Sequence, residues 1–368
     1  MKIVFLVHSL RKGGAERLVL ELASCKEAFN AEIEVISWLD TNEYLEDKYK
    51  DVKFTSILKT KEYRWLFSLK SSSSILRTML NSISPDVVFI FSHSVLWLSL
   101  LARYKSVYVN VIQGFNQISK FRKVKKLFYR PIDIISSRLL NLYFITPTLE
   151  LANEVSKYFC IALSRITIIS NGIEVKIDDS KPTRNEHPNI CMLGTLGYQK
   201  GQHLAIEAMV QLVKKDPLIT LNIIGDGELK ITLEEKISNL GLKNNVFLLG
   251  RVEDPFLFMQ KADIFWHLSM TEGMPLAVIE AMALGLPIVG FDVEGVREVV
   301  TDEHNGYLLE YGDVNGIVEK SNFLFGHEIY RRNMSELSQK IYSSKYTKST
   351  MITSYKKFIA NIENSLKS

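Results

Sequence analysis

Short apolar runs alternate with longer stretches of helical spacing along most of the chain, which is the pattern of a parallel α/β sheet. The first run, Ile3–Val7, is continuously apolar, as expected for a strand that is covered on both faces. Ser71–Ser74 is interpreted as a cap and loop before a helix. The predicted strands are Ile3–Val7, Ile33–Trp38, Asp86–Phe91, Val107–Ile112, Tyr143–Thr146, Ile166–Ser170, Ile190–Leu193, Leu221–Ile224, Val246–Leu249, Ile264–His267 and Ile288–Phe291.

A polar stretch interrupts this alternation near the middle of the chain. Residues 174–188 contain two aspartates and two prolines, a composition typical of an interdomain linker. We therefore expect a first domain over residues 1–173 and a second over residues 189–341, followed by a helical, lysine-rich tail over residues 342–368. With 368 residues, the chain is long enough for two domains that each bury a core.

The composition excludes several classes of protein. Apolar residues make up 46% and charged residues 23%, as in soluble globular proteins, and no apolar stretch reaches the ~20 residues of a membrane helix. Three scattered cysteines predict neither a disulfide framework nor a zinc site. The dinucleotide fingerprint G-x-G-x-x-G is absent after the first strand, which argues against hydride chemistry with NAD. A cytoplasmic protein is expected.

Charge is distributed unevenly. Residues 1–180 hold 25 Lys and Arg against 18 Asp and Glu, a net charge of +7, whereas residues 181–368 carry a net charge of −3. Residues 101–132 contain no acid, and Ile118, Phe121, Val124 and Phe128 recur there at helical spacing. Such a segment can lie on an anionic membrane surface, or it can pack its apolar stripe on its own domain, and both alternatives remain open. Nucleic acid is not expected, because no recognised binding motif accompanies the charge.

Two glutamates mark the segment with the most specific chemistry. Glu272 and Glu280 stand eight positions apart within Thr271–Pro287, in otherwise apolar surroundings. Pro275 suits the first turn of a helix, and Gly285 suits the left-handed residue that ends one. This arrangement predicts a polar ligand at the helix N-terminus, with hydroxyls for the glutamates and a negative group for the helix N–H groups. The alternative is one capping glutamate and one glutamate in a buried ion pair.

The same segment resembles the E-x7-E signature of the family 4 glycosyltransferases, a retaining group with the GT-B fold. The matching residues are Glu272, Gly273, Met274, Pro275, Leu276, Glu280, Ala281 and Met282. The resemblance implies two Rossmann-like domains that face each other across a cleft, with the tail crossing back to the first. It also implies transfer of a hexose or N-acetylhexosamine from a nucleoside-diphosphate sugar, expected to be a UDP-sugar, to a hydroxyl of a glycan or polyprenyl-linked acceptor. The basic stretch adds the expectation of a peripheral location on the inner face of the cytoplasmic membrane.

The resemblance also assigns residues of the second domain. Glu272 would hold sugar hydroxyls, and Glu280 would hold the ribose. Lys200, in the loop that follows Ile190–Leu193, would neutralise the leaving diphosphate, and Thr195 stands where the family has an arginine, so that Arg251 would compensate. The helix N-terminus would contribute through Gly273, Met274, Pro275 and Leu276. No D-x-D motif stands at a matching place, so no metal or other cofactor is expected.

In the first domain, the resemblance points to two places. Gly13 and Gly14 match the glycine loop beside the donor diphosphate, although a Gly-Gly turn can also be a plain strand-to-helix connection. His93 follows the strand Asp86–Phe91 and would orient a substrate hydroxyl, or it is an ordinary loop histidine. The expected catalytic residues are therefore Glu272, Lys200 and His93.

Two rival functions fit the same sequence. One is a GT-B protein that binds a sugar nucleotide or a partner without transferring sugar, which the substitution at Thr195 favours. The other is a nucleotide-sugar epimerase of the same fold, which needs no acceptor.

Overall fold

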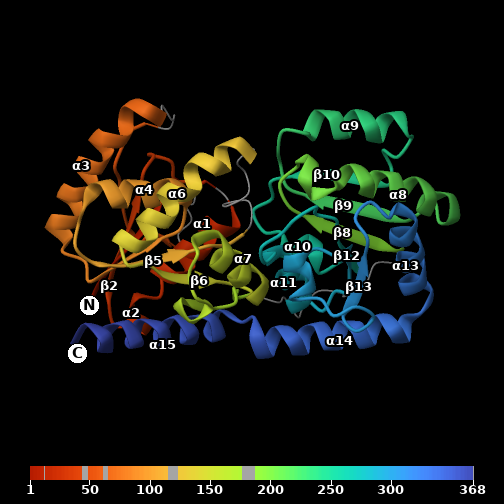
Figure 1. Ribbon diagram of the computed structural model, residues 1–368. Coiled ribbons are helices and arrows are strands. Elements are labelled where there is room, and N and C mark those ends of the chain that lie inside the picture. Colours follow the sequence, from red (N-terminus) through yellow and green to blue (C-terminus); the bar gives the residue numbers. More distant parts are fainter. Residues whose placement is uncertain (12, 44–48, 61–64, 115–122, 176–186, 368) are drawn as a thin grey trace. The chain divides into compact units, whose positions relative to one another are not determined.

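The computed structural model describes the chain except for residues 12, 44–48, 61–64, 115–122, 176–186 and 368 (Figure 1). The chain forms two compact units. Unit 1 comprises Met1–Asn171 together with Met351–Ser368, and unit 2 comprises Gly172–Thr350. Most of the predicted linker, residues 176–186, lies outside the described residues.

Unit 1 is built on a seven-stranded sheet in which the paired strands run parallel, in the order β3-β2-β1-β4-β5-β6-β7. The order reverses at β1, whose neighbours are β2 and β4, so the loops after β1 and β4 diverge and leave room for a ligand at their carboxyl ends. The strands are β1 (Lys2–Val7), β2 (Glu32–Ser37), β3 (Lys53–Ser56), β4 (Val87–Ile90), β5 (Val107–Val111), β6 (Tyr143–Thr146) and β7 (Ile166–Ile168).

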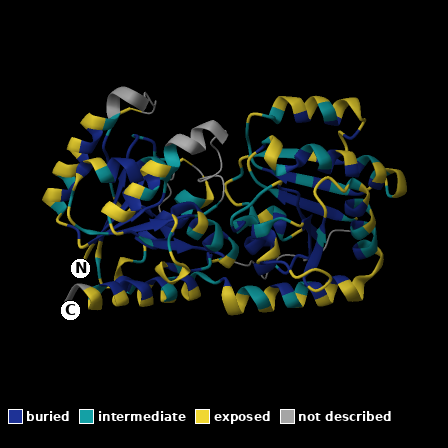
Figure 2. Ribbon diagram, viewed as in Figure 1, coloured by how far each residue is buried: buried dark blue, intermediate teal, exposed yellow. Residues whose placement is uncertain are grey.

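Helices cover both faces of this sheet, which explains why β1 is apolar at consecutive positions (Figure 2). Phe5 and alternate strand residues pack with α1, α2 and α15, whereas Leu6 and the intervening residues pack with α3, α4 and α7. The helices of unit 1 are α1 (Gly14–Ala23), α2 (Lys26–Phe29), α3 (Trp65–Ile83), α4 (His93–Ala102), α6 (Lys123–Leu139), α7 (Leu149–Phe159), the 3-10 turn η2 (Leu163–Arg165) and α15 (Lys348–Lys367).

Unit 2 repeats this arrangement with six strands in the order β10-β9-β8-β11-β12-β13, and its order reverses at β8. Its strands are β8 (Asn189–Leu193), β9 (Thr220–Ile224), β10 (Val246–Gly250), β11 (Ile264–His267), β12 (Ile288–Phe291) and β13 (Gly306–Leu309). Its helices are η3 (Tyr198–Lys200), α8 (Gln202–Lys215), α9 (Lys230–Asn239), α10 (Phe256–Met259), α11 (Leu276–Ala283), α12 (Glu294–Arg297), α13 (Val314–Gly326) and α14 (Glu328–Lys345).

The prediction of an α/β protein with two parallel sheets is confirmed, and each predicted strand is present within two residues at either end. Three expectations are wrong in detail. The strands β3 and β13 are not among those predicted. Ser71–Ser74 lies inside α3, where the Ser72 hydroxyl accepts a hydrogen bond from the Trp38 indole (3.0 Å) and the Ser73 hydroxyl donates to the carbonyl of Lys70 (2.7 Å).

The tail is two helices rather than one. Between α14 and α15, the backbone of Ile173 donates to Tyr346 O (3.0 Å) and accepts from Lys348 N (2.9 Å), which forms an isolated parallel bridge with Thr347. The hydrophobic residues of α15, among them Tyr355 and Phe358, pack into the core of unit 1. Among the described residues, no helix is long and apolar enough to cross a membrane.

Candidate functional site

The loops after β8 and β11 of unit 2 lie against each other at the carboxyl end of the sheet. Met270 N donates to Gln199 O (2.8 Å), which joins the two backbones. Gly201 has φ +72°, and a Cβ at this position would lie 2.1 Å from the carbonyl oxygen of Leu268. Because open α/β sheets bind ligands where the strand order reverses, these two loops form the candidate ligand site of unit 2.

A charged cluster joins the same two loops. Lys200 Nζ lies 2.5 Å from Glu272 Oε1, and His267 Nε2 lies 3.1 Å from the same oxygen. Burial alone would raise the pKa of Glu272, but the hydrogen bond from His267 and the charge of Lys200 outweigh it and hold this pKa below its ordinary value. Glu272 is therefore ionised at neutral pH, and its carboxylate accepts hydrogen bonds from both Lys200 and His267.

His267 is a member of this cluster that the sequence analysis missed. It is the last residue of β11 and is only 5% exposed. Its position at the carboxyl end of a parallel strand, five residues before Glu272, is the signal that could have identified it. The strand was predicted to its correct end, but no role was assigned to its final side chain.

The helix α11 follows directly. Pro275 caps it from an extended conformation (φ −76°, ψ 110°), one residue before the helix rather than in its first turn. Gly285 has φ +71° and terminates the helix region as predicted. Glu280 is 2% exposed within α11 and interacts with neighbouring groups there. The backbone before the helix is tightly packed, since a Cβ at Gly295 would lie 2.4 Å from Gly273 O. Met274 is buried and Leu276 is half-buried.

The loops after β8, β9 and β10 are joined through backbone contacts. Leu196 N donates to Asp226 O (3.1 Å), and Gln202 Nε2 donates to Thr195 O (3.1 Å), which fixes the loop that carries Thr195. Arg251 lies on the neighbouring loop with Nε 4.0 Å from Asp226 Oδ2, and 60% of its side chain is exposed. Arg251 therefore lies on a loop adjacent to the loop that carries Thr195.

The predicted residues of unit 1 lie at the carboxyl ends of β1 and β4. Gly13 caps α1 with extended backbone, and Gly14 is the first residue of that helix. His93 is the first residue of α4 and directly follows its N-cap, Ser92. A hydrogen bond of 3.0 Å between His8 Nδ1 and Ser94 Oγ connects the two regions.

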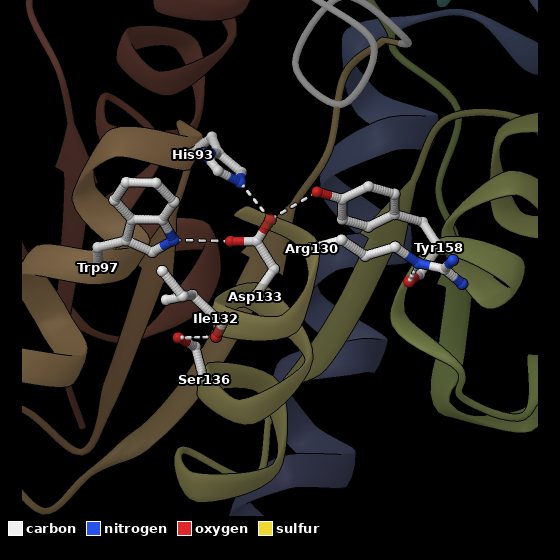
Figure 3. A network of polar contacts seen from close by, with 7 residues as sticks. All are labelled: His93, Trp97, Arg130, Ile132, Asp133, Ser136 and Tyr158. Atoms are coloured by element: carbon white, nitrogen blue, oxygen red, sulfur yellow. Dashed lines mark hydrogen bonds and ion pairs between the residues drawn. The ribbon is translucent and has the colours of Figure 1, made fainter. Parts of the chain in front are cut away.

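His93 contacts a buried acid that the sequence analysis did not identify. Its Nε2 lies 2.8 Å from Asp133 Oδ2, and Asp133 also accepts hydrogen bonds from Trp97 Nε1 (2.6 Å) and Tyr158 OH (2.6 Å) (Figure 3). Asp133 directly follows the acid-free stretch of residues 101–132. Nothing in the sequence distinguishes it from a solvated helix residue.

The structure thus brings most predicted donor residues into one region of unit 2. Lys200 and Glu272 touch directly, residues 273–276 continue from Glu272 into α11, and Arg251 lies on a neighbouring loop. Gly13, Gly14 and His93 belong to unit 1. Within the described part of the chain, no three His, Cys, Asp or Glu side chains are grouped so that they could hold a metal ion.

Two family models match consecutive parts of the chain. The model described as Glycosyltransferase Family 4 matches residues 12–176, and the model described as Glycosyl transferases group 1 matches residues 175–341. The class defined by the fold is GT-B, with two Rossmann-like parallel-sheet domains. The chain belongs to the family 4 glycosyltransferases.

Individual relatives and structures support this assignment. An uncharacterized glycosyltransferase of Methanocaldococcus jannaschii is 35% identical over 191 residues, which cover 49% of this chain and 45% of the relative. The chain therefore spans about half the length of this relative, as it does for two others that are 32% and 24% identical.

Two further matches extend over almost the whole chain. The GalNAc-alpha-(1->4)-GalNAc-alpha-(1->3)-diNAcBac-PP-undecaprenol alpha-1,4-N-acetyl-D-galactosaminyltransferase of Campylobacter jejuni is 24% identical over 91% of both chains. The crystal structure of Anabaena HepE in complex with UDP and glucose superimposes with a TM-score of 0.80 at 19% identity, covering 98% of this chain and 99% of that one. At this level of identity, the likeness shows the fold.

Proposed function

We propose that this protein is a retaining glycosyltransferase that moves a hexose or N-acetylhexosamine from a UDP-sugar to a hydroxyl of a lipid-linked glycan. The observation that carries the proposal is the cluster of Lys200, Glu272 and His267 at the point of unit 2 where the strand order reverses. The full-length similarity to a transferase whose name specifies an undecaprenol-linked acceptor supports the acceptor class, and the UDP complex of Anabaena HepE supports the donor class.

Lys200 serves the leaving diphosphate in this proposal. An ammonium group has three donors, so Lys200 can keep its contact with Glu272 while it donates to a phosphate oxygen. The N-terminus of α11, at Met274, Pro275 and Leu276, adds a positive dipole end beside Gly273. Charge on the diphosphate grows as the glycosidic bond breaks, so these groups stabilise the transition state more than the ground state.

The other donor contacts follow from their places on neighbouring loops. Glu272 accepts hydrogen bonds from sugar hydroxyls, and Glu280 accepts them from the ribose. Arg251 supplies the cation that Thr195 lacks, from the loop joined to it through Asp226. Gly13 and Gly14, in unit 1, allow a ligand to approach the backbone closely there. In this proposal, Lys200, Arg251 and the N-terminus of α11 stabilise the charge on the leaving diphosphate in place of a divalent metal ion, so the reaction requires no metal.

The acceptor is proposed to be presented at the inner face of the cytoplasmic membrane. Ile118 and Phe121 of the expected apolar stripe lie outside the described residues, as do the side chains of Val124 and Phe128. In the described part of α6, an exposed apolar row continues at helical spacing through Ile132 (41% exposed), Ile135 (52%) and Leu139 (71%). A basic helix with such a row suits an anionic lipid surface.

One assay distinguishes the proposed function from its rivals. The purified chain is incubated with a panel of UDP-sugars, with and without undecaprenyl-diphosphate glycans, and products are analysed by mass spectrometry and NMR. A transferase extends the lipid-linked glycan with retained anomeric configuration, and EDTA leaves the rate unchanged. An epimerase converts the sugar nucleotide without acceptor. Thermal stabilisation by UDP without any product identifies a binding protein, the alternative that Thr195 favours, and overturns the proposal.

A further inference from the structure

The carboxylate of Asp133 ties three helices of unit 1 together. It stands on α6, is completely buried, and receives hydrogen bonds from two α4 side chains, His93 and Trp97, and from Tyr158 of α7 (Figure 3). A buried carboxylate is costly unless hydrogen bonds compensate its lost hydration. Here three donors approach its two oxygens, so Asp133 has a fixed position and a fixed orientation.

His93 is the partner of Asp133 that lies nearest to the carboxyl end of the sheet. It begins α4 directly after β4 and its side chain is 15% exposed, whereas Asp133 is not exposed at all. The Nε2 nitrogen faces Asp133 Oδ2 at 2.8 Å, and a carboxylate at this distance accepts a hydrogen bond from a protonated ring nitrogen. The neutral ring is then protonated on Nε2, and Nδ1 is its acceptor nitrogen.

We propose that Asp133 is the positioning residue for His93. It holds the imidazole at the carboxyl end of β4 with Nε2 protonated, so that Nδ1 accepts the proton of a substrate hydroxyl in a hydrogen bond. The proposal rests on the proposed function for the identity of that hydroxyl, which belongs to donor or acceptor sugar. The protonation of Nε2 itself follows from the geometry of unit 1 alone.

The surrounding groups favour this assignment of roles. Burial raises the pKa of Tyr158, and its hydrogen bond to Asp133 raises it further, so the phenol remains a neutral donor. Arg130 donates to the backbone carbonyls of Tyr158 and Lys157 (2.9 Å each), which holds the end of α7 and leaves Asp133 to its three partners. Two other titratable groups contact the α4 residues among the described side chains: Tyr129, whose ring packs on Trp97, and His8, which contacts Ser94.

The test combines Asp133→Asn with two matched controls. Tyr158→Phe and Trp97→Phe each remove one hydrogen-bond donor from the Asp133 carboxylate. Both variants keep the contact between Asp133 and His93. Ring 15N chemical shifts report which nitrogen of each of the seven histidines carries the proton, and His93→Asn assigns the signal. Each variant is also assayed for kcat and KM with the donor and acceptor identified for the wild type, and for Tm.

The expected wild-type spectrum shows His93 protonated on Nε2, and Asp133→Asn shifts protonation towards Nδ1. In the same variant kcat falls by at least about tenfold, because a misdirected proton acceptor contributes little to the transition state. The two controls lower Tm but keep the His93 tautomer and a kcat within about twofold. A wild-type His93 protonated on Nδ1 alone overturns the proposal even if Asp133→Asn does not fold. Equal losses of kcat in all three variants also overturn it. A wild type that has the expected spectrum but no transferase activity contradicts the proposed function and leaves the pairing of Asp133 with His93 standing.

Discussion

Lys200 Nζ lies 2.5 Å from Glu272 Oε1, and this contact joins the loop after β8 to the loop after β11. The two residues have different proposed partners, the diphosphate for Lys200 and the sugar for Glu272. Because His267 contacts the same carboxylate oxygen, the three side chains form one connected polar cluster. A substitution at one position therefore changes the electrostatic surroundings of the other two.

The first prediction concerns Lys200→Ala. We expect kcat to fall more than donor affinity, because the ammonium group stabilises charge that develops on the leaving diphosphate. Stability should also decrease, since Glu272 loses one of its two donors. Steady-state kinetics measures the change in kcat, and calorimetric titration with UDP measures the change in affinity. Lys236→Ala is the matched control, because Lys236 of α9 forms an ion pair of the same length (2.5 Å) with Glu207 of α8, outside the proposed site. An unchanged kcat in folded Lys200→Ala contradicts the role.

The second prediction concerns the pH dependence of stability. The pKa of Glu272 is lower in the folded protein than its ordinary value of 4.5, so its stabilising contribution is complete above about pH 4.5 and is lost as pH falls towards the folded pKa. Wild type should therefore exceed Glu272→Gln in free energy of unfolding by more at pH 7 than at pH 3.5. Urea unfolding at both values measures this difference. A gap that stays constant between them means that the folded structure does not lower this pKa.

The third prediction concerns Glu280→Gln, which keeps the volume of the side chain and removes its charge. If Glu280 accepts hydrogen bonds from the ribose, UDP binding should weaken by about 1–3 kcal/mol, as for other charged hydrogen-bonding groups. Calorimetry with UDP and with a matched 2′,3′-dideoxyribose analogue provides the measurement. The analogue should bind wild type and variant equally, because it lacks the hydroxyls. A variant that binds UDP normally would leave Glu280 with a structural role.

The sequence was sufficient for those features that arise from local pattern. Most residues of the predicted strands are apolar because helices cover both faces of both sheets. Gly285 was recognisable because a left-handed residue is needed between α11 and β12. The strand β3 was missed because three of its four residues, Lys53, Thr55 and Ser56, are polar. The serine run in α3 was wrongly predicted to be a cap and loop. The hydrogen bond that Ser72 accepts from Trp38 joins residues 34 positions apart, so the local sequence does not indicate it.

In the candidate site, too, local motifs could be predicted from the sequence, whereas contacts between distant residues could not. Lys200 and Glu272 could be identified because each stands in a motif of contiguous residues. Their direct contact could not, because 72 positions separate them and only the adjacency of β8 and β11 brings them together. Asp133 lies 40 positions from His93 and carries no motif, so pattern reasoning had no means of finding it.

The fourth prediction concerns the close approach of the two donor loops. Gly201→Ala combines a left-handed backbone, which costs about 1–2 kcal/mol, with a methyl group that would lie 2.1 Å from Leu268 O. Gly241→Ala has the same φ sign (+71°) but open space, and Gly197→Ala has neither strain nor contact. Tm should therefore decrease in the order Gly197→Ala, Gly241→Ala, Gly201→Ala. Only Gly201→Ala should also lower turnover, since it displaces the loop that carries Lys200. Equal Tm values for Gly201→Ala and Gly241→Ala contradict this packing.

The fifth prediction concerns binding of α6 to anionic lipid. Each Lys or Arg near such a surface contributes about 1 kcal/mol, so the basic residues of the stretch 120–130 are enough for reversible attachment. The exposed row of Ile132, Ile135 and Leu139 would add apolar contact. We expect the protein to sediment with vesicles that contain phosphatidylglycerol and not with neutral vesicles, and salt should release it because it screens exposed charges.

Three variants separate the contributions to that binding. Substitution of Lys123, Lys125 and Lys126 by Glu should abolish sedimentation with anionic vesicles. Substitution of Ile132, Ile135 and Leu139 by Ser should weaken sedimentation but leave its salt dependence unchanged, because the charges remain.

The control replaces Lys214, Lys215 and Lys243, three exposed lysines of unit 2, by Glu, and this variant should bind like wild type. If the control loses binding as completely as the α6 charge variant, net charge rather than this helix accounts for the attachment. Equal sedimentation of wild type with anionic and neutral vesicles would make α6 an ordinary solvated helix and favour an acceptor that is free in solution.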